Sequence, residues 1–286
     1  MLALLIAPGP NLRVMNHRGS SSTPASTVSA DDDRPAVRCL GVGKRRAGRS
    51  VLDDISFSMP QGASVAIVGL NGAGKTTLLR LMLDFLRPDA GRIELFGIAS
   101  TQPIARRHLT FLPERYAPSP DLTGWQSLRL TLGLQSIKAD RSACESDLDR
   151  LGFDLAALDA PAREYSKGMV QKLGLAGALQ SAAPLTVLDE PMSGLDPLAR
   201  RNLVAVLAGL RASGRGLLFT AHGLHELDAL CDRIAVIHDA RLAFFGSPAE
   251  LCRRADSTDL EQAFLALIGA LPERAPQAQS NCLQPA

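Results

Sequence analysis

A group of glycines directly precedes a lysine and two threonines in the segment "IVGLNGAGKTTLLR". The spacing is G-x-x-x-x-G-K-[ST], from Gly69 to Thr76. Glycine reaches left-handed backbone angles and lets a ligand approach closely, so the N–H groups of such a loop can surround phosphate oxygens. Lys75 would then contact the β- and γ-phosphates, and the Thr76 hydroxyl would hold Mg²⁺. An ordinary strand-to-helix turn is the alternative reading.

The residues on either side decide between these readings. Val65 to Val68 form a short β-branched and apolar run, which predicts a buried strand. Lys75 to Leu86 predict a helix that is apolar on most faces and therefore buried. The start of such a helix attracts phosphate through its unpaired N–H groups and its dipole. Strand, loop and helix together favour a nucleoside triphosphate site.

Two adjacent carboxylates in "LTVLDEPMSGLDP" form the second candidate chemistry. Four apolar residues that end in Asp189 and Glu190 place both acids at the tip of a buried strand. Asp189 is suited to support the Mg²⁺ held by Thr76, and Glu190 to orient or deprotonate the water that attacks the γ-phosphate. Alone, the pair would fit a strand that ends in two solvated acids, but the Lys-Thr loop favours the catalytic reading.

The remaining elements predict an α/β layered sheet that binds phosphates at the carboxyl ends of its strands. "LTVLDEP", "GLLFTAH" and "RIAVIHD" are apolar runs of the parallel-strand type. Pro197 and Gly214 suit the start and the stop of a helix between the first two runs. "VLDDISFSMPQGASVAIVG" and "GRIELFG" predict further strands, and residues 122 to 179 predict a helical insertion.

The composition fits a folded protein with a sizeable core, because 46% of its 286 residues are hydrophobic and 21% are charged. The net charge of +2 gives no electrostatic reason to expect nucleic acid as a partner. No run approaches the roughly 18 apolar residues that span a bilayer. The chain has five cysteines, without paired or metal-type spacing, and we expect them to be reduced thiols without a role: Cys39, Cys144, Cys231, Cys252 and Cys282.

Both ends of the chain differ in composition from its middle. Residues 1–35 are expected to form a disordered arm that is rich in Ser, Thr, Pro and Asp. Its start, "MLALLIAPGP", lacks the basic region of a signal peptide, and Met15 is an alternative start. Residues 271–286 are expected to form a disordered tail.

A third motif, "YSKGMVQKLGLAGAL", makes a family visible. Residues 165–171 resemble the signature of ABC transporter ATP-binding subunits, with Tyr-Ser-Lys-Gly-Met where the common form is Leu-Ser-Gly-Gly-Gln. The order agrees too: glycine loop, helical insertion, signature, Asp-Glu strand, and then residues 193–196 in the place of the D-loop. His222 matches the switch histidine after the next strand. Alone, Ser166 would fit a helix N-cap and His222 a core or surface histidine. The order of the motifs therefore carries the resemblance.

The resemblance implies an α/β P-loop NTPase core with a mainly parallel sheet, an N-terminal antiparallel β subdomain and an inserted helical subdomain. The ABC ATPase domain is expected at residues 36–270, with its helical subdomain at about 115–180. ATP and Mg²⁺ are the implied cofactors, Glu190 and His222 the catalytic residues, and Thr76, Asp189 and Glu114 the metal ligands. The implied nucleotide-binding residues are Gly69, Leu70, Asn71, Gly72, Ala73, Gly74, Lys75, Thr76, Thr77, Ser166, Lys167, Gly168, Met169, Ser193 and Asp196.

In this family two such domains stack head to tail, and each ATP lies between the glycine loop of one chain and the signature of the other. The resemblance therefore implies a second copy of this chain, or a homologous ATPase subunit, as a partner. Ser166 and the N–H groups of Lys167 and Gly168 stand at an expected helix start, which suits a γ-phosphate.

Three departures from the common pattern are informative. Glu114 stands where a glutamine is usual, and it remains a hard oxygen ligand for Mg²⁺. Together with the Lys-Gly-Met of the signature, it makes the chain look like the ABC-2-type exporter group. No aromatic residue precedes Phe57 to stack on adenine, and Arg45, Arg46 or Arg49 is left as a substitute.

The same resemblance implies separate transmembrane permease subunits, which the segment with Tyr116, Pro118 and Pro120 would contact. The chain would then be cytoplasmic, peripheral on the cytoplasmic face of the cell membrane. The sequence indicates neither the transported substrate nor whether the ATPase pair is a homodimer, and only the resemblance favours export over import. A soluble ABC ATPase that remodels ribosomes or DNA is the alternative, and a small-molecule P-loop kinase is a more distant one.

Overall fold

The computed structural model describes residues 34–221, 223–224 and 227–269. The statements that follow concern these residues. His222, residues 1–33 of the expected arm and all of the expected tail lie outside them.

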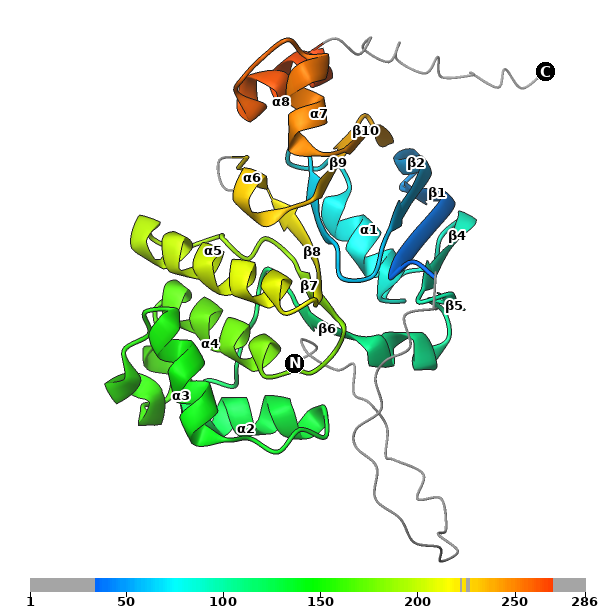
Figure 1. The fold of residues 1–286 in the computed structure, drawn as a ribbon. Coiled ribbons are helices and arrows are strands. Elements are labelled where there is room, and N and C mark those ends of the chain that lie inside the picture. Colours follow the sequence, from blue (N-terminus) through cyan, green and yellow to red (C-terminus); the bar gives the residue numbers. More distant parts are fainter. Residues whose placement is uncertain (1–33, 222, 225–226, 270–286) are drawn as a thin grey trace, which may run out of the picture.

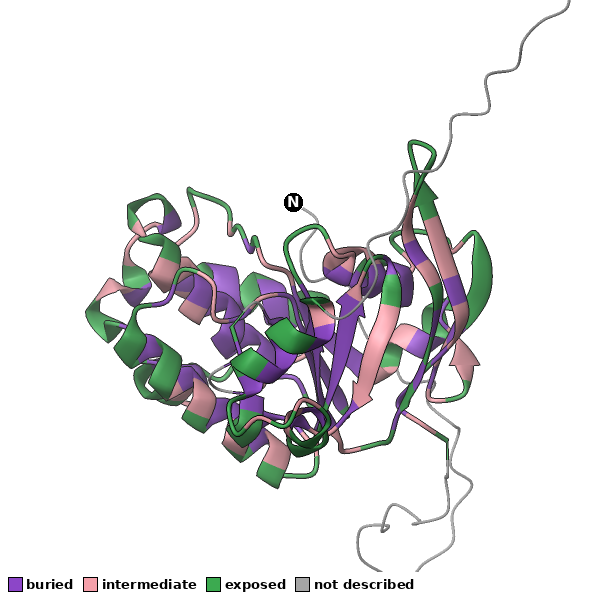
Figure 2. Ribbon diagram, turned by 90° about the horizontal axis from the view of Figure 1, so that it is seen from above, coloured by how far each residue is buried: buried purple, intermediate pink, exposed green. Residues whose placement is uncertain are grey.

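The larger of two sheets contains the predicted parallel strands (Figure 1). Among the described residues it has the order β10-β9-β3-β8-β7-β6, in which all neighbours are parallel except β10 and β9. Its strands are β3 (Ser64–Val68), β6 (Leu109–Leu112), β7 (Leu185–Leu188), β8 (Gly216–Ala221), β9 (Arg233–His238) and β10 (Arg241–Gly246). Every residue of β3, β6, β7 and β8 is buried, as expected of parallel strands with both faces covered (Figure 2). The predicted α/β fold is confirmed.

A smaller antiparallel sheet has the order β2-β1-β4-β5 in the described part of the chain. Its strands are β1 (Val37–Arg46), β2 (Arg49–Met59), β4 (Ala90–Leu95) and β5 (Ile98–Ala99). Helix α1 (Lys75–Met82) lies between the two sheets (Figure 1). Val65 and Ile67 of β3 share a core with α1 and the small sheet, whereas Ala66 and Val68 belong to the core on the opposite face. This alternation follows from the two-residue period of a strand.

Helix α1 ends earlier than the sequence predicted, because residues 83–86 leave the helix. Asp84 has a left-handed φ of 61°, and the N–H groups of Phe85 and Leu86 both donate to the carbonyl oxygen of Arg80. The Asp84 carboxylate pairs with Arg106, at 3.2 Å. Phe85 and Leu86 are thereby turned out of the helix and are 44% and 36% exposed.

A helical lobe follows β6 and lies beside the larger sheet (Figure 1). The expectation of helix from 122 to 179 is met only in part, because loops and short 3₁₀ turns separate three helices. The lobe consists of α2 (Gly124–Leu134), α3 (Arg141–Arg150), α4 (Lys167–Leu179) and the 3₁₀ turns Leu155–Asp159 and Ala162–Glu164. Thr123 begins α2 in a reciprocal capping box with Gln126.

Helix α5 (Pro197–Ala212) runs between β7 and β8, with Pro197 in its first turn and Gly214 just beyond its end, as predicted. The remaining helical elements are the 3₁₀ turn Pro103–His108, α6 (Leu227–Leu230), α7 (Pro248–Arg254) and α8 (Leu260–Gly269). In the described ranges no helix combines the length and the apolar character that crossing a bilayer requires.

Candidate functional site

The glycine loop begins where β3 ends and packs tightly between two other strands. A Cβ atom at Gly69 would lie 2.5 Å from the carbonyl oxygen of Ile237 in β9. One at Gly74 would lie 2.8 Å from Leu52 in β2, and Gly74 also has a left-handed φ of 106°. Only glycine fits both positions without displacing a neighbour. The structure places the other loop residues Leu70, Asn71, Gly72 and Ala73 between these two anchors, and Thr77 in the first turn of α1.

Lys75 lies inside this loop and is only 4% exposed. Its ammonium group donates hydrogen bonds to the carbonyl oxygens of Gly69, at 2.8 Å, and Leu70, at 3.3 Å. Burial lowers the pKa of Lys75 below its ordinary value, and the negative charges of nearby carboxylates, Glu190 first, oppose this shift. The loop therefore holds one cation at the start of α1, where the helix dipole also attracts anions.

The carboxyl ends of β3, β6, β7 and β8 meet at one edge of the sheet, since these strands are parallel. Asp189 follows β7 there and is 4% exposed. Its Oδ1 atom accepts hydrogen bonds from Thr76, at 3.4 Å, and from Thr220 of β8, at 2.7 Å. Burial raises the pKa of Asp189, and these two hydrogen bonds oppose the shift. The structure thus brings the Thr76 hydroxyl and the Asp189 carboxylate together, as the sequence predicted.

Glu190 lies next to Asp189, with a left-handed φ of 50° that is unusual for a residue other than glycine. Its N–H group donates to the hydroxyl oxygen of Thr220, at 2.7 Å. Pro191 follows, and its carbonyl oxygen accepts a hydrogen bond of 3.2 Å from the buried amide of Gln171 in α4. Thr220 and Gln171 were not among the predicted site residues. Both contacts join segments distant in sequence, so no local pattern reveals them.

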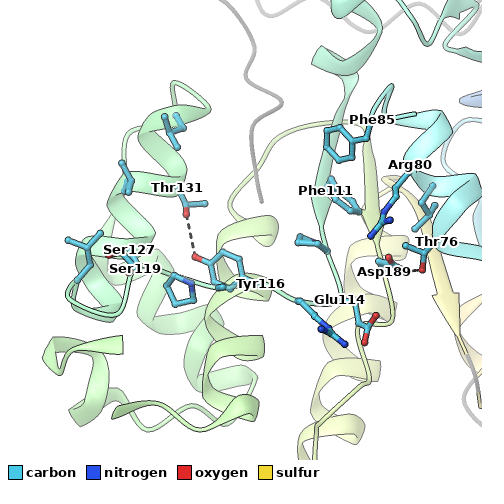
Figure 3. Close-up of a pocket in the computed structure, with 18 of the residues that line it drawn as sticks. Thr76, Arg80, Phe85, Phe111, Glu114, Tyr116, Ser119, Ser127, Thr131 and Asp189 are labelled. Atoms are coloured by element: carbon cyan, nitrogen blue, oxygen red, sulfur yellow. Dashed lines mark hydrogen bonds between the residues drawn. The ribbon is translucent and has the colours of Figure 1, made fainter. Parts of the chain in front are cut away.

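Glu114 follows β6 and lines a groove of about 1100 Å³ together with Thr76 and Asp189 (Figure 3). The three expected metal ligands therefore share one cavity. A hydroxyl and two carboxylates are hard oxygen donors that fit Mg²⁺, which commonly takes one or two carboxylates together with phosphate oxygens. No group of three or more His, Cys, Asp or Glu side chains poised to hold a metal ion occurs in the described residues.

The groove continues away from these polar residues between α1 and the helical lobe (Figure 3). Tyr116, Pro118 and Pro120 line it, as do Phe85 and Leu86 beyond the end of α1 and Leu130 and Leu134 of α2. Leu130 is 53% exposed and Leu134 is 42% exposed. One end of this cavity is thus polar and acidic, and the other end is largely apolar.

The signature residues lie at the start of α4, in the helical lobe. The Ser166 hydroxyl caps this helix by accepting a hydrogen bond of 3.2 Å from the N–H of Met169. Ser166 and Lys167 are exposed, and the Lys167 ammonium contacts the Ser193 hydroxyl at 3.5 Å. Gly168 packs toward the backbone of Gly194, which follows Ser193. The signature therefore contacts the turn that carries the expected D-loop.

Asp196 ends that turn and caps α5, because its carboxylate accepts a hydrogen bond of 2.9 Å from the N–H of Ala199. Leu198, in the first turn of α5, is 67% exposed. His222, the expected switch histidine, lies outside the described residues.

Comparisons with known proteins agree with this geometry. Residues 52–193 match the family model described as "ABC transporter". The chain is 41% identical, over 70% of its length, to an uncharacterized ABC transporter ATP-binding protein of Nostoc sp., and spans 61% of that relative. It is 34% identical to the Nod factor export ATP-binding protein I of Ralstonia nicotianae, over 80% of this chain and 73% of the relative. A solved ATP-binding subunit of an ABC transporter matches with a TM-score of 0.71 and 28% identity, over 81% of this chain and 99% of that structure.

Proposed function

Because the chain belongs to the ABC transporter family, as one of its ATP-binding and ATP-hydrolysing members, we propose that it powers an ABC-2-like exporter with separate permease subunits. The observation that carries the proposal is the groove that joins the acidic site to an exposed apolar surface. The name of one relative, a Nod factor export ATP-binding protein, supports export as the process. The cargo of that relative is not transferred to this chain.

In this proposal ATP binds with its triphosphate in the glycine loop, whose N–H groups and Lys75 neutralise its negative charge. Thr76, Asp189 and Glu114 would hold Mg²⁺. When bound, the ion would neutralise charge on the phosphate oxygens. Glu190 would accept a proton from the attacking water, and we assign His222 the role of the switch histidine.

A second chain would complete the site. Ser166, Lys167, Gly168 and Met169 of one chain would face the γ-phosphate bound by the other, since they form a helix start whose first two residues are exposed. Ser193 and Asp196 would lie at the same interface. The 67% exposed side chain of Leu198 supports this arrangement, because a large apolar group beside the D-loop becomes covered on pairing. The partner is a second copy or a homologous ATPase subunit.

The apolar part of the groove is the proposed docking site for a cytoplasmic segment of the permease. Phe85, Leu86, Leu130 and Leu134 offer that segment exposed apolar surface. Glu114 of the acidic site belongs to the same chain segment as Tyr116, which lines the apolar part of the groove. An occupant of the groove would therefore contact the segment that carries a proposed metal ligand. The chain would be held on the cytoplasmic face of the membrane in this way.

The test first asks whether a gene for a polytopic membrane protein lies beside the gene for this chain. That membrane protein is then co-expressed with the full chain and with two variants. Leu130→Glu places a charge in the groove, whereas Leu155→Glu changes another exposed leucine of the lobe that does not line it. We expect L130E to lose copurification with the membrane protein while keeping ATP hydrolysis, and L155E to keep both. Copurification of L130E at the wild-type level would overturn the docking site. Failure of the unaltered chain to copurify would overturn the exporter assignment.

A further inference from the structure

We propose that Thr220 is a positioning residue that sets Asp189 and Glu190 relative to each other through a single hydroxyl group. This inference rests on the ATP hydrolysis of the proposed function, and it adds a residue that neither the sequence motifs nor the family resemblance supplies. Thr220 touches neither the triphosphate nor the water in this proposal. It acts through the two acidic residues.

The directions of both hydrogen bonds are fixed by the chemistry of the partners. The backbone N–H of Glu190 can only donate, so the Thr220 oxygen accepts at 2.7 Å. An ionised carboxylate can only accept, so the one hydroxyl proton of Thr220 goes to Oδ1 of Asp189, also at 2.7 Å. Thr220 is fully buried, so its hydroxyl group is shielded from water. One oxygen atom thereby determines where both acidic residues stand.

The sheet explains why position 220 has this role. Strands β7 and β8 are parallel, and their last paired residues are Leu188 and Phe219. Asp189 follows Leu188, and Thr220 follows Phe219. The two side chains therefore meet just where β7 ends. Thr220 is itself paired with Ile67 of β3, which fixes its backbone from the other side.

Glu190 depends on this contact because its own backbone is strained. Its φ of 50° lies in the left-handed region, which β-carbon sterics disfavour, and a following proline restricts it further. Such a conformation persists only where neighbours hold it. Thr220 holds the N–H of Glu190, and Gln171 holds the carbonyl oxygen of Pro191. Loss of the Thr220 hydroxyl removes the acceptor of this part-buried hydrogen bond and frees the turn to move.

The hydroxyl has an effect on hydrolysis that differs from its effect on ATP binding. In the proposed function the glycine loop and Lys75 bind the triphosphate, whereas the hydrogen bonds of the Thr220 hydroxyl go to Asp189 and Glu190. Thr220→Val keeps the shape and the β-branching of the side chain and removes only the hydroxyl. Supporting hydrogen bonds to metal ligands change activity by about 10- to 100-fold when removed. We expect a loss of that size in kcat, with the KM for ATP little changed.

The experiment compares T220V and Thr220→Ser with Thr110→Val in the full chain. Thr110 is a matched control, since it is a buried strand threonine of β6 whose hydroxyl has no hydrogen-bond partner in the described structure. We measure kcat, the KM for ATP and the Mg²⁺ concentration for half-maximal rate. Calorimetry with ATP, with and without Mg²⁺, gives a readout that does not require turnover.

We expect T220V to lower kcat and to raise the Mg²⁺ requirement, T220S to restore most of both, and T110V to behave like the wild type. In calorimetry, T220V should keep the affinity for ATP without Mg²⁺ and lose part of the increment that Mg²⁺ adds. If T220V fails to fold, the same measurements are made on Thr220→Ala, which also lacks the hydroxyl. Wild-type kcat in T220V, or a T220S variant as impaired as T220V, would overturn the inference. Neither result depends on the permease, so the exporter assignment stands or falls separately.

Discussion

The ammonium nitrogen of Lys75 lies 2.8 Å from the carbonyl oxygen of Gly69, so the first residue of the glycine loop and the first residue of α1 hold each other. This contact closes the loop on itself and keeps a cation inside it. Burial lowers the pKa of Lys75, but three acidic residues counter the shift, and the side chain stays positioned for an anion. The loop is therefore preorganised for its ligand by its own backbone.

Lys75→Ala is expected to weaken ATP binding without unfolding the chain. A charge-assisted hydrogen bond contributes about 1.5–3 kcal/mol, which corresponds to about 10- to 150-fold in affinity. Isothermal calorimetry measures the change, with the exposed Lys138→Ala of the helical lobe as the control. Unchanged affinity in K75A would count against the phosphate assignment of the whole loop.

Glu190→Gln is expected to keep ATP binding and to lose hydrolysis, because glutamine keeps the shape of the side chain and cannot take a proton from water. The ATP-bound pair should then accumulate. Size-exclusion chromatography with ATP would detect it as a dimer that the wild type forms only transiently. Near-normal turnover in E190Q would remove Glu190 from the catalytic role.

Glu114→Gln is expected to retain most of the activity and to raise the Mg²⁺ requirement. Glutamine keeps an oxygen ligand in the groove but removes a negative charge. Glu114→Ala removes the ligand as well and should cost more. Titration of the ATPase rate with Mg²⁺ separates the two variants. Equal Mg²⁺ requirements in the wild type, E114Q and E114A would mean that Glu114 does not hold the ion.

The geometry of the β1–β2 hairpin distinguishes among the three arginines that could stack on the adenine. The Arg45 guanidinium donates to the carbonyl oxygen of Gly48, at 2.8 Å, and is thereby held at the tip of the hairpin. Arg46 and Arg49 face each other across the strands and are exposed. Like charges so placed repel each other, so the two guanidinium groups are kept apart. The face of either one is then available for an aromatic base to stack on.

We therefore expect Arg46→Ala or Arg49→Ala to raise the KM for ATP, and Arg45→Ala to leave it nearly unchanged. Without a stacked aromatic ring, which contributes roughly 1–3 kcal/mol, discrimination between ATP and GTP should be modest. Measuring the KM of both nucleotides in these variants tests the prediction. A strong preference for ATP that no arginine change disturbs would point to another group.

The buried cysteines predict a pH dependence. Burial raises the pKa of Cys231 to about 12 and that of Cys144 to about 11, and it raises that of Cys39 well above its usual range. A thiol whose pKa is higher in the folded state stabilises that state below the unfolded value of 9.0, and this contribution is lost as the pH rises toward the folded value. The free energy of unfolding should therefore fall above about pH 9.

Chemical denaturation at several alkaline pH values measures this loss, and a thiol reagent provides an independent check. At pH 8 the native protein should protect Cys39, Cys144 and Cys231, which are buried, and react more readily at the partly exposed Cys252. Rapid labelling of Cys231 in the native state would contradict the burial on which the prediction depends.

The parts of the site that local sequence determines could be predicted before the structure. The glycine loop needs its residue types at fixed spacing, and Asp189 follows a run of strand residues that are all buried. The resemblance also indicated the ABC ATPase fold, which the family match bears out. The assigned roles of the site residues remain predictions for the variants above to test.

Contacts between distant segments could not be predicted in the same way. Nothing near Thr220 in sequence marks it as the partner of residues 31 and 30 positions earlier. The early end of α1 was missed for a related reason: Asp84 takes a left-handed angle and pairs with Arg106, 22 residues later. In both cases tertiary hydrogen bonds override the local pattern.

The hydrogen bond from Gln171 to Pro191 has a mechanical consequence. Ser166 begins α4, and Gln171 lies little more than one turn into the same helix, so the two residues move as one stiff piece. Pro191 follows Glu190 directly, so a displacement of the exposed start of α4 would be transmitted through one helical turn and the Gln171 amide to the peptide beside Glu190, the proposed catalytic base. In the proposed dimer, the α4 surface that would face the neighbouring nucleotide is thus mechanically coupled to Glu190, the residue proposed to act on the chain's own nucleotide. Gln171→Asn shortens the side chain by one methylene, so the hydrogen bond to Pro191 would be lost. The start of α4 and the turn at Glu190 would then no longer be coupled, although each would stay in place.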